Sequence, residues 1–242
     1  MRSQSPDTWV VGIDDTDTPA AGGTGRLARR VAVEVDALAM GRSLGVTRHQ
    51  FYEGPGVPKT ARNSAAAIIF DRVASPSELF ETVCGIVVRD SIDGSDPGVA
   101  IGTGPVSAHL VDFARRAQTG LVGQAAARLL GARLVTDLVG LGGTEDGVIG
   151  ALGALALRLD GDDGRFVDLP GIREVSGRMT VAEVLERTGI ADVIDDKERR
   201  SLQPTNRLEL GDWVRPRLLG GRPVLVARRG EEAWVNADTR SR

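Results

Sequence analysis

The sequence predicts a mixed α+β (α/β) protein that ends in a small C-terminal β appendage. Over residues 8–159, short apolar runs of strand length alternate with longer stretches in which apolar residues recur at helical spacing. From residue 207 onward only short β-type runs remain, and glycine and proline interrupt them. The composition fits this class, because 242 residues with 41% hydrophobic and 26% charged side chains can bury a sizeable core.

The elements follow from the chain order. An apolar strand over residues 8–13 is followed by an acidic and glycine-rich loop and then by a helix over 26–40. Further strands are expected at 44–52, 65–70 and 99–102, and further helices at 75–90, 105–118, 121–130, 147–159 and 180–187. Thr180 and Glu183 have the spacing of a capping box at the start of the last helix. Strands and helices in this order suit an α+β sandwich, for which a ferredoxin-like order is one candidate.

We expect three regions. Residues 1–194 form the main region, without a defined internal boundary. The charged and polar stretch 195–206 is the best candidate for a linker, and residues 207–242 form the β appendage. The length is compatible with one large domain or two small ones, and we favour two.

Charge and composition exclude several classes of protein. The net charge of −3 gives no global positive field, so any contact with RNA must be local. No run approaches the roughly 20 apolar residues of a membrane span, and the first residues lack a signal peptide, so we expect a cytoplasmic protein. The single cysteine, Cys84, excludes an internal disulfide or a zinc ribbon. With only His49 and His109, a histidine-based mechanism has little support.

Three carboxylates follow the first strand. Asp14, Asp15 and Asp17 lie within four residues and would repel one another unless a cation or hydrogen-bond donors compensate them. Magnesium is the obvious cation, since proteins hold it with one or two carboxylates plus substrate phosphates. The alternative is an acidic turn with a side-chain cap. We expect a magnesium site here, with these residues also taking part in catalysis.

A glycine-rich loop leads from these carboxylates into the next helix. Gly22, Gly23, Thr24 and Gly25 would place free backbone N–H groups and the positive end of the helix dipole at one spot, which suits a phosphate group. The loop matches no established nucleotide-binding pattern, and Thr24 could also be the N-cap of the helix. Combined with the aspartates, it predicts metal and phosphate binding at one place.

A second loop offers cationic and polar donors. Within residues 54–63, prolines stiffen the chain while Lys59, Thr60, Arg62 and Asn63 could hold an anion such as a triphosphate. A solvated loop is the alternative.

The segment 142–155 is rich in glycine and alanine. Such small residues allow a helix to pack very close to a sheet, but the helix N-terminus at Gly147 could equally face a phosphate or a cationic substrate group. Asp96, in the turn Asp96-Pro97-Gly98, is a further candidate for this binding site.

Taken together, these blocks resemble the archaeal agmatinylcytidine synthetase family, which modifies an isoleucine tRNA. They occur in the family's order over about residues 9–160, as Gly12-Ile13-Asp14-Asp15-Thr16-Asp17, a threonine seven residues beyond Asp17, Pro58-Lys59-Thr60 with Asn63, Asp96-Pro97-Gly98, and Gly147-Val148-Ile149-Gly150-Ala151-Leu152. The resemblance implies a kinase-like domain that splits ATP, combined with a ferredoxin-like domain.

The resemblance also implies roles for residues. Asp14, Asp15 and Asp17 match the magnesium and ATP ligands, and Thr24 matches a threonine that is phosphorylated. A further set matches phosphate or nucleotide contacts, namely Lys59, Thr60 and Asn63. In that family a cytidine oxygen is activated so that agmatine can displace it, and an OB-fold and a zinc ribbon grip the tRNA.

We therefore expect an ATP- and Mg²⁺-dependent ligase or phosphotransferase that activates an oxygen of its acceptor by phosphoryl transfer. A small-molecule acceptor is favoured, because one cysteine cannot build a zinc ribbon and the net charge is acidic. Two alternatives stay open: an enzyme that modifies a tRNA cytidine with a partner protein, and a non-catalytic nucleotide-binding regulatory module. The tail is locally basic and could contact RNA through Arg215, Arg217, Arg222, Arg228 and Arg229. The oligomeric state also stays open.

Overall fold

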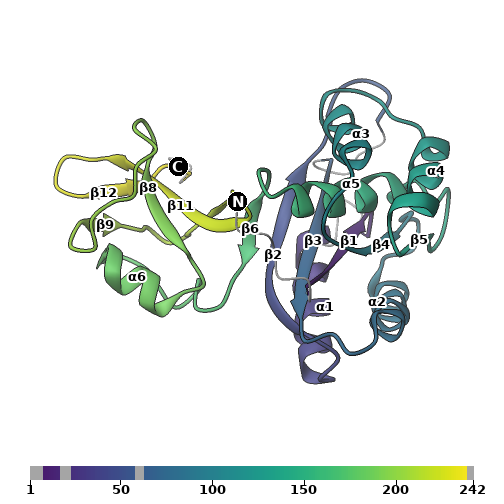
Figure 1. The fold of residues 1–242 in the computed structure, drawn as a ribbon, viewed down its shortest axis with the longest axis horizontal. Coiled ribbons are helices and arrows are strands. Elements are labelled where there is room, and N and C mark those ends of the chain that lie inside the picture. Colours follow the sequence, from purple (N-terminus) through teal and green to yellow (C-terminus); the bar gives the residue numbers. More distant parts are fainter. Residues whose placement is uncertain (1–7, 17–22, 58–62, 239–242) are drawn as a thin grey trace.

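The computed structural model describes residues 8–16, 23–57 and 63–238, and within these residues the chain forms twelve strands and six helices (Figure 1). The strands join into one mostly antiparallel sheet, in the order β5-β4-β1-β3-β2-β6-β10-β11-β12-β9-β7, with β8 beside β11. The predicted α+β class is confirmed.

The N-terminal part has a ferredoxin-like order. Its elements run β-α-β-β-α-β along the chain, and its strands lie in the antiparallel order β4-β1-β3-β2. The elements are β1 (Trp9–Asp14), α1 (Thr24–Ala37), β2 (Arg42–Gln50), β3 (Ser64–Asp71), α2 (Pro76–Asp90) and β4 (Gly98–Thr103). The predicted ferredoxin-like order is therefore present, with element bounds within a few residues of those expected from periodicity.

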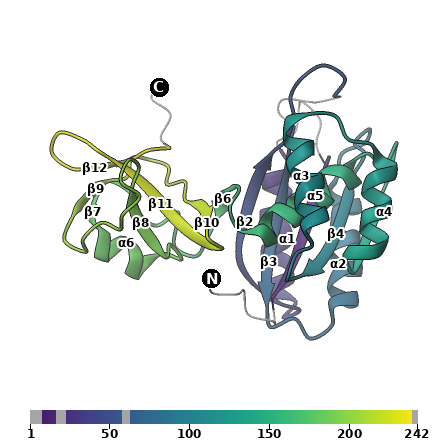
Figure 2. The same cartoon turned by 45° about the horizontal axis from the view of Figure 1, so that its top comes forward.

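Both faces of this sheet are covered by helices. On one face, α1 and α2 bury alternate residues of the central strands, including Ile13, Ile68 and Phe70. On the other face lie α3 (Ala108–Thr119), α4 (Gln124–Leu134) and α5 (Gly147–Asp160), which stand in front of the sheet in Figure 2. A short strand, β5 (Asp137–Gly140), extends the sheet beyond β4. The result is a three-layer body with a hydrophobic core on each side of the sheet.

Helix α5 packs unusually close to the sheet. A Cβ atom at Gly12 would collide with the backbone oxygen of Ala151, and one at Gly98 would collide with the backbone of Gly147. Glycine is therefore required where β1 and β4 pass under α5. This is the close packing that the small residues of segment 142–155 predicted.

A second, mostly β unit follows α5 and stands apart from the first body in Figure 1. It continues the sheet through β6, which pairs with β2, and it has its own core around Phe166, Val193 and Leu225. Its elements are β6 (Arg165–Asp168), β7 (Arg178–Thr180), α6 (Val181–Arg187), β8 (Asp192–Asp195), β9 (Arg207–Glu209), β10 (Arg217–Leu219), β11 (Arg222–Arg229) and β12 (Trp234–Asn236). The capping box of α6 is confirmed, since Thr180 and Glu183 each accept a hydrogen bond from the other's backbone N–H.

The core of the second unit suggests where the two units divide. Strand β8 pairs with β11, and Ile194 bridges to Ser201, so the expected linker 195–206 lies within this unit. We propose that the boundary lies at residues 161–164, between α5 and β6, rather than at 194. No helix among the described residues is long and apolar enough to cross a membrane.

Candidate functional site

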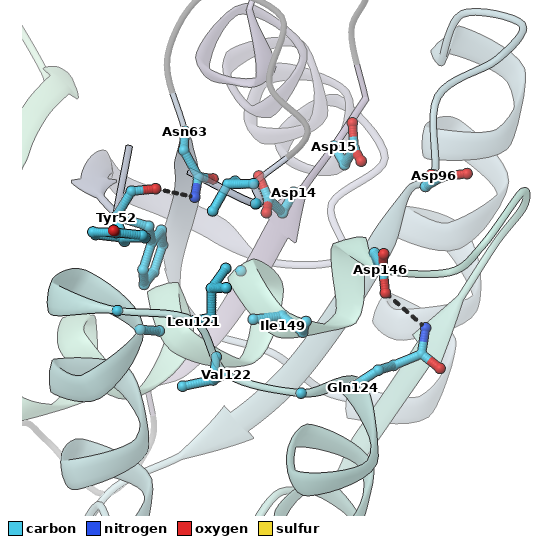
Figure 3. A pocket seen from close by; sticks show the side chains of 17 residues that line it. Asp14, Asp15, Tyr52, Asn63, Asp96, Leu121, Val122, Gln124, Asp146 and Ile149 are labelled. Carbon is cyan, nitrogen blue, oxygen red and sulfur yellow. Dashed lines mark hydrogen bonds between the residues drawn. The ribbon is translucent and has the colours of Figure 1, made fainter. Parts of the chain in front are cut away.

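A cavity of about 260 Å³ opens at one edge of the N-terminal sheet (Figure 3). Because β1 is antiparallel to β3 and β4, and β2 is antiparallel to β3, the ends of β1 and β2 meet the starts of β3 and β4 at this edge. The topology thereby brings Asp14 and Asp15 next to Tyr52, Asn63 and Asp96, although these residues are far apart in sequence.

One side of the cavity is acidic. Asp14, Asp15, Asp96 and Asp146 all line it, and Figure 3 shows them on the side away from Tyr52. Asp14 ends β1 and packs against Gly150 of α5, where a Cβ atom would collide with the Asp14 carboxylate. Asp15 has a φ of 51°, a left-handed conformation that turns the chain out of the strand and that Asp tolerates better than most residues.

Asp96 and Asp146 are tied to neighbouring loops. The two carboxylate oxygens of Asp96 accept hydrogen bonds from the backbone N–H and the hydroxyl of Thr144, both at 2.8 Å. Asp146 accepts from Nε2 of Gln124 at 3.3 Å, and that amide also donates to the carbonyl of Thr144 at 2.7 Å. These bonds join the loop before α5 to the turn before β4 and to the start of α4. They therefore fix the positions of Asp96 and Asp146 relative to each other.

The opposite side of the cavity is apolar and aromatic. Phe51 and Tyr52 follow β2, and the other members of this wall are Leu121, Val122 and Ile149. Nδ2 of Asn63 donates to the carbonyl of Tyr52 at 2.8 Å, and the carbonyl of Asn63 accepts from the backbone N–H of Phe51 at the same distance. An apolar and aromatic lining with a few polar groups is typical of cavities that bind small molecules.

The donor set fits magnesium. Asp14 and Asp15 offer hard oxygen donors, and there is no histidine or cysteine among the described residues that line the cavity. The described residues contain no cluster of three His, Cys, Asp or Glu side chains that could hold a metal alone. Two carboxylates suit an ion that completes its shell with water and substrate phosphates.

Apart from Gly147, the predicted site residues fall into three groups. Asp14, Asp15, Asn63 and Asp96 lie together around the cavity. Thr24 is only 5% exposed and begins α1, with exposed Gly23 as its N-cap and Gly25 inside the helix, and these three are not among the described residues that line the cavity. The predictions for Asp17, Gly22, Lys59, Thr60 and Arg62 lie outside the described residues.

Gly147 has a packing role in this structure. Its backbone N–H donates to the carbonyl of Asp96 at 3.0 Å, and a Cβ atom would fall 2.6 Å from the backbone nitrogen of Gly98. The N–H is therefore engaged within the protein. Nucleotide binding by Gly147 stays a prediction.

Sequence reasoning missed the apolar wall of the cavity. Tyr52 is the only tyrosine of a chain with 4% aromatic residues, so the pair Phe51-Tyr52 at a strand end was a usable signal. Leu121 and Val122 lie between α3 and α4 and carried no such signal, because only the packing of these helices over the sheet brings them to the cavity.

Solved structures share the N-terminal fold. A tRNA fluorescent labeling enzyme matches with a TM-score of 0.53 and 24% identity, over 62% of this chain and 36% of that one. The complex of TiaS with its isoleucine tRNA and ATP matches with the same figures. Apo TiaS, described as an agmatidine synthetase of that tRNA, matches with a TM-score of 0.52 and 23% identity, over 62% and 35% of the two chains.

The N-terminal part of this chain has the TiaS fold. This agrees with the resemblance carried by the sequence blocks. The matched region spans about a third of the length of each neighbour. No protein-family model matches the sequence, and no curated protein matches it.

Proposed function

We propose that the protein is an ATP- and Mg²⁺-dependent enzyme that activates an oxygen of its acceptor by phosphoryl transfer. The observation that carries the proposal is the cavity itself, where Asp14 and Asp15 at the end of β1 face an apolar and aromatic wall. The shared fold supports it, since TiaS has been solved with ATP and with AMPCPP and agmatine.

The two sides of the cavity bind different parts of ATP. Asp14 and Asp15 hold the magnesium ion, which when bound neutralises charge on the phosphates. The adenine base of ATP packs against the apolar wall, and water is excluded from that end of the cavity by Phe51, Tyr52 and Ile149. Positioning and charge neutralisation then supply most of the catalysis, as is general for phosphoryl transfer.

Thr24 is the proposed protein acceptor of a transient phosphate. It is the first residue of α1, so a phosphate on its hydroxyl lies at the positive end of the helix dipole, where negative charge is stabilised. In the first transfer, the bond between the γ-phosphorus and the bridging oxygen of ADP breaks, a bond from phosphorus to the hydroxyl oxygen of Thr24 forms, and the hydroxyl proton passes to water. In the second transfer, the bond from phosphorus to Thr24 breaks, a bond from phosphorus to the acceptor oxygen forms, and Thr24 recovers a proton. The phosphate then stays on the acceptor, or an amine attacks the acceptor carbon and inorganic phosphate leaves with the acceptor oxygen.

The final acceptor is proposed to be a small molecule, as expected from the acidic net charge. The second candidate, an RNA acceptor, is favoured by one observation, the basic groove described in the next subsection. A non-catalytic nucleotide-binding module is the alternative that remains if the protein binds ATP but releases no ADP with any acceptor.

The site assignment is tested by Asp15→Asn. We expect this variant to lose most of the rise in melting temperature that ATP and magnesium cause, because the amide cannot replace the carboxylate charge on the metal. The matched control is Asp212→Asn, an exposed aspartate of the second unit, which should respond as wild type does. Equal stabilisation of both variants by ATP would remove Asp15 from the site.

A further inference from the structure

A second cavity lies at the junction of the two units. It measures about 600 Å³ and is lined by residues of β2, α3, β6 and β10 and by residues of the segments that lead into β6 and β10. Four arginines line it, namely Arg48, Arg165, Arg215 and Arg217. We call this cavity the arginine groove.

The arginine groove carries net positive charge although the protein is acidic overall. Asp163 is the only acidic residue that lines it in the described part of the chain, and Arg115 pairs with this carboxylate at 3.2 Å. Asp238, whose side chain is 5% exposed, pairs with Arg217 at 2.7 Å and with Arg165 at 3.0 Å. One buried carboxylate thus holds two arginines in place and neutralises only part of their charge.

An exposed tryptophan forms part of the groove wall. Trp213 is 49% exposed, and the guanidinium carbons of Arg173 and Arg215 lie 5.0 and 5.9 Å from its ring centroid. An arginine held on an aromatic ring loses less freedom when it binds an anion, because its planar group is already oriented. Arginines beside an aromatic surface are the chemistry that recognises phosphate esters of nucleotides.

The arginine groove lies next to the cavity at the end of β1, which we call the ATP cavity. Gln50 lines the groove, and the two residues that follow it, Phe51 and Tyr52, line the cavity. Nε2 of Gln50 donates to the carbonyl of Asn63 at 2.7 Å, and Nε2 of Gln118 donates to the carbonyl of Gln50 at 3.2 Å. The groove and the cavity thus meet at the end of β2.

We propose that the arginine groove binds phosphate groups of the acceptor, and that the acceptor is a nucleotide or a single-stranded nucleic acid. The identification of this ligand as the acceptor rests on the proposed function. The binding of phosphate groups in the groove does not depend on ATP chemistry. Arg165, Arg215 and Arg217 belong to the second unit, whereas the structural match covers the N-terminal part of the chain. The recognition of phosphate would thus be added by the second unit.

The test compares two double variants. Arg165→Gln/Arg215→Gln removes two charges of the groove, and Arg222→Gln/Arg228→Gln removes two exposed charges of β11 that lie outside it. A fluorescein-labelled uridine decamer, followed by anisotropy, probes nucleic acid binding, and uridine 5′-monophosphate, followed by calorimetry, probes a single nucleotide. All measurements are made without ATP, at several salt concentrations.

We expect the affinity of the groove variant for its probe to fall at least about tenfold for each arginine removed. The affinity of the β11 variant should be close to that of wild type. For the decamer, the slope of log affinity against log salt should fall by about 0.7 for each arginine that contacted a phosphate. Binding of the decamer supports a nucleic acid acceptor, and binding of the mononucleotide alone supports a small one. The proposal is overturned if neither probe binds wild type, or if both double variants lose binding equally.

The outcome is separable from that of the proposed function. Stabilisation by ATP and magnesium is measured on the same proteins and should be unchanged in the groove variant, because its arginines do not line the ATP cavity. Probe binding without any ATP response would leave the groove in place and refute the ATP site.

Discussion

Gly150→Ala tests the position of Asp14 through a single methyl group. A Cβ atom at Gly150 would lie 2.5 Å from Cγ of Asp14 and 3.0 Å from its Cβ, so the carboxylate must move to make room. An alanine in a helix interior normally stabilises by about 1 kcal/mol over glycine. Overpacking costs about 1–3 kcal/mol, so we expect a net change between zero and a loss of about 2 kcal/mol.

The control for this variant is Gly85→Ala, in α2, where an added Cβ meets no described atom within 4 Å. Its free energy of unfolding should rise by about 1 kcal/mol, the difference in helix propensity between alanine and glycine, and it should bind ATP as wild type does. Urea denaturation gives the two stabilities, and calorimetry with ATP and magnesium gives the affinities. Gly150→Ala should bind ATP at least about tenfold more weakly, since Asp14 leaves its place. Wild-type affinity in Gly150→Ala would refute Asp14 as a ligand.

Two further predictions concern phosphorylation and pH. Intact mass after incubation with ATP and magnesium should show one added phosphate on wild type and none on Thr24→Ala; equal addition to both would end that role for Thr24. His49 is fully buried, with Nδ1 at 3.0 Å from Asp163, and burial lowers its pKa below the usual 6.5 despite the opposing carboxylate. As pH falls, the imidazole of His49 binds a proton in the unfolded chain at a higher pH than in the folded protein. The stabilisation of the folded state by neutral His49 is therefore complete above pH 6.5 and is lost as pH falls below it. Urea stability of wild type should therefore drop between pH 7 and 5 more steeply than that of His49→Gln, and parallel profiles would contradict the assignment.

Local patterns in the sequence were sufficient for the N-terminal elements. Residues 8–13 form an uninterrupted apolar run because β1 is buried on both faces, and helical spacing marks α1 and α2 because each has one face on the sheet. The same run predicted that Asp14 and Asp15 stand at a strand end. These features depend only on neighbours in the chain.

Contacts between distant segments could not be predicted in this way. The strands β6 to β8 have only three or four residues each, too few for a period to be read, so sequence reasoning placed the start of the appendage at residue 207 and not at the boundary that we propose. The arginine groove exists because β6 pairs with β2, which brings Arg165 to Arg48. Asp96 was expected to face a nucleotide, and it lines the cavity, but its bonds to Thr144 arise from a loop that sequence reasoning treated as a separate motif.

The central claim is that the cavity at the end of β1 binds ATP with magnesium. The most direct measurement is the melting temperature of the wild-type chain with magnesium alone and with magnesium plus a series of ATP concentrations. At an ATP concentration of about 100 times Kd, binding should stabilise the protein by about 2.7 kcal/mol, which raises Tm by about 5–10 °C in a chain of this size. A Tm that stays the same at every ATP concentration would contradict the account.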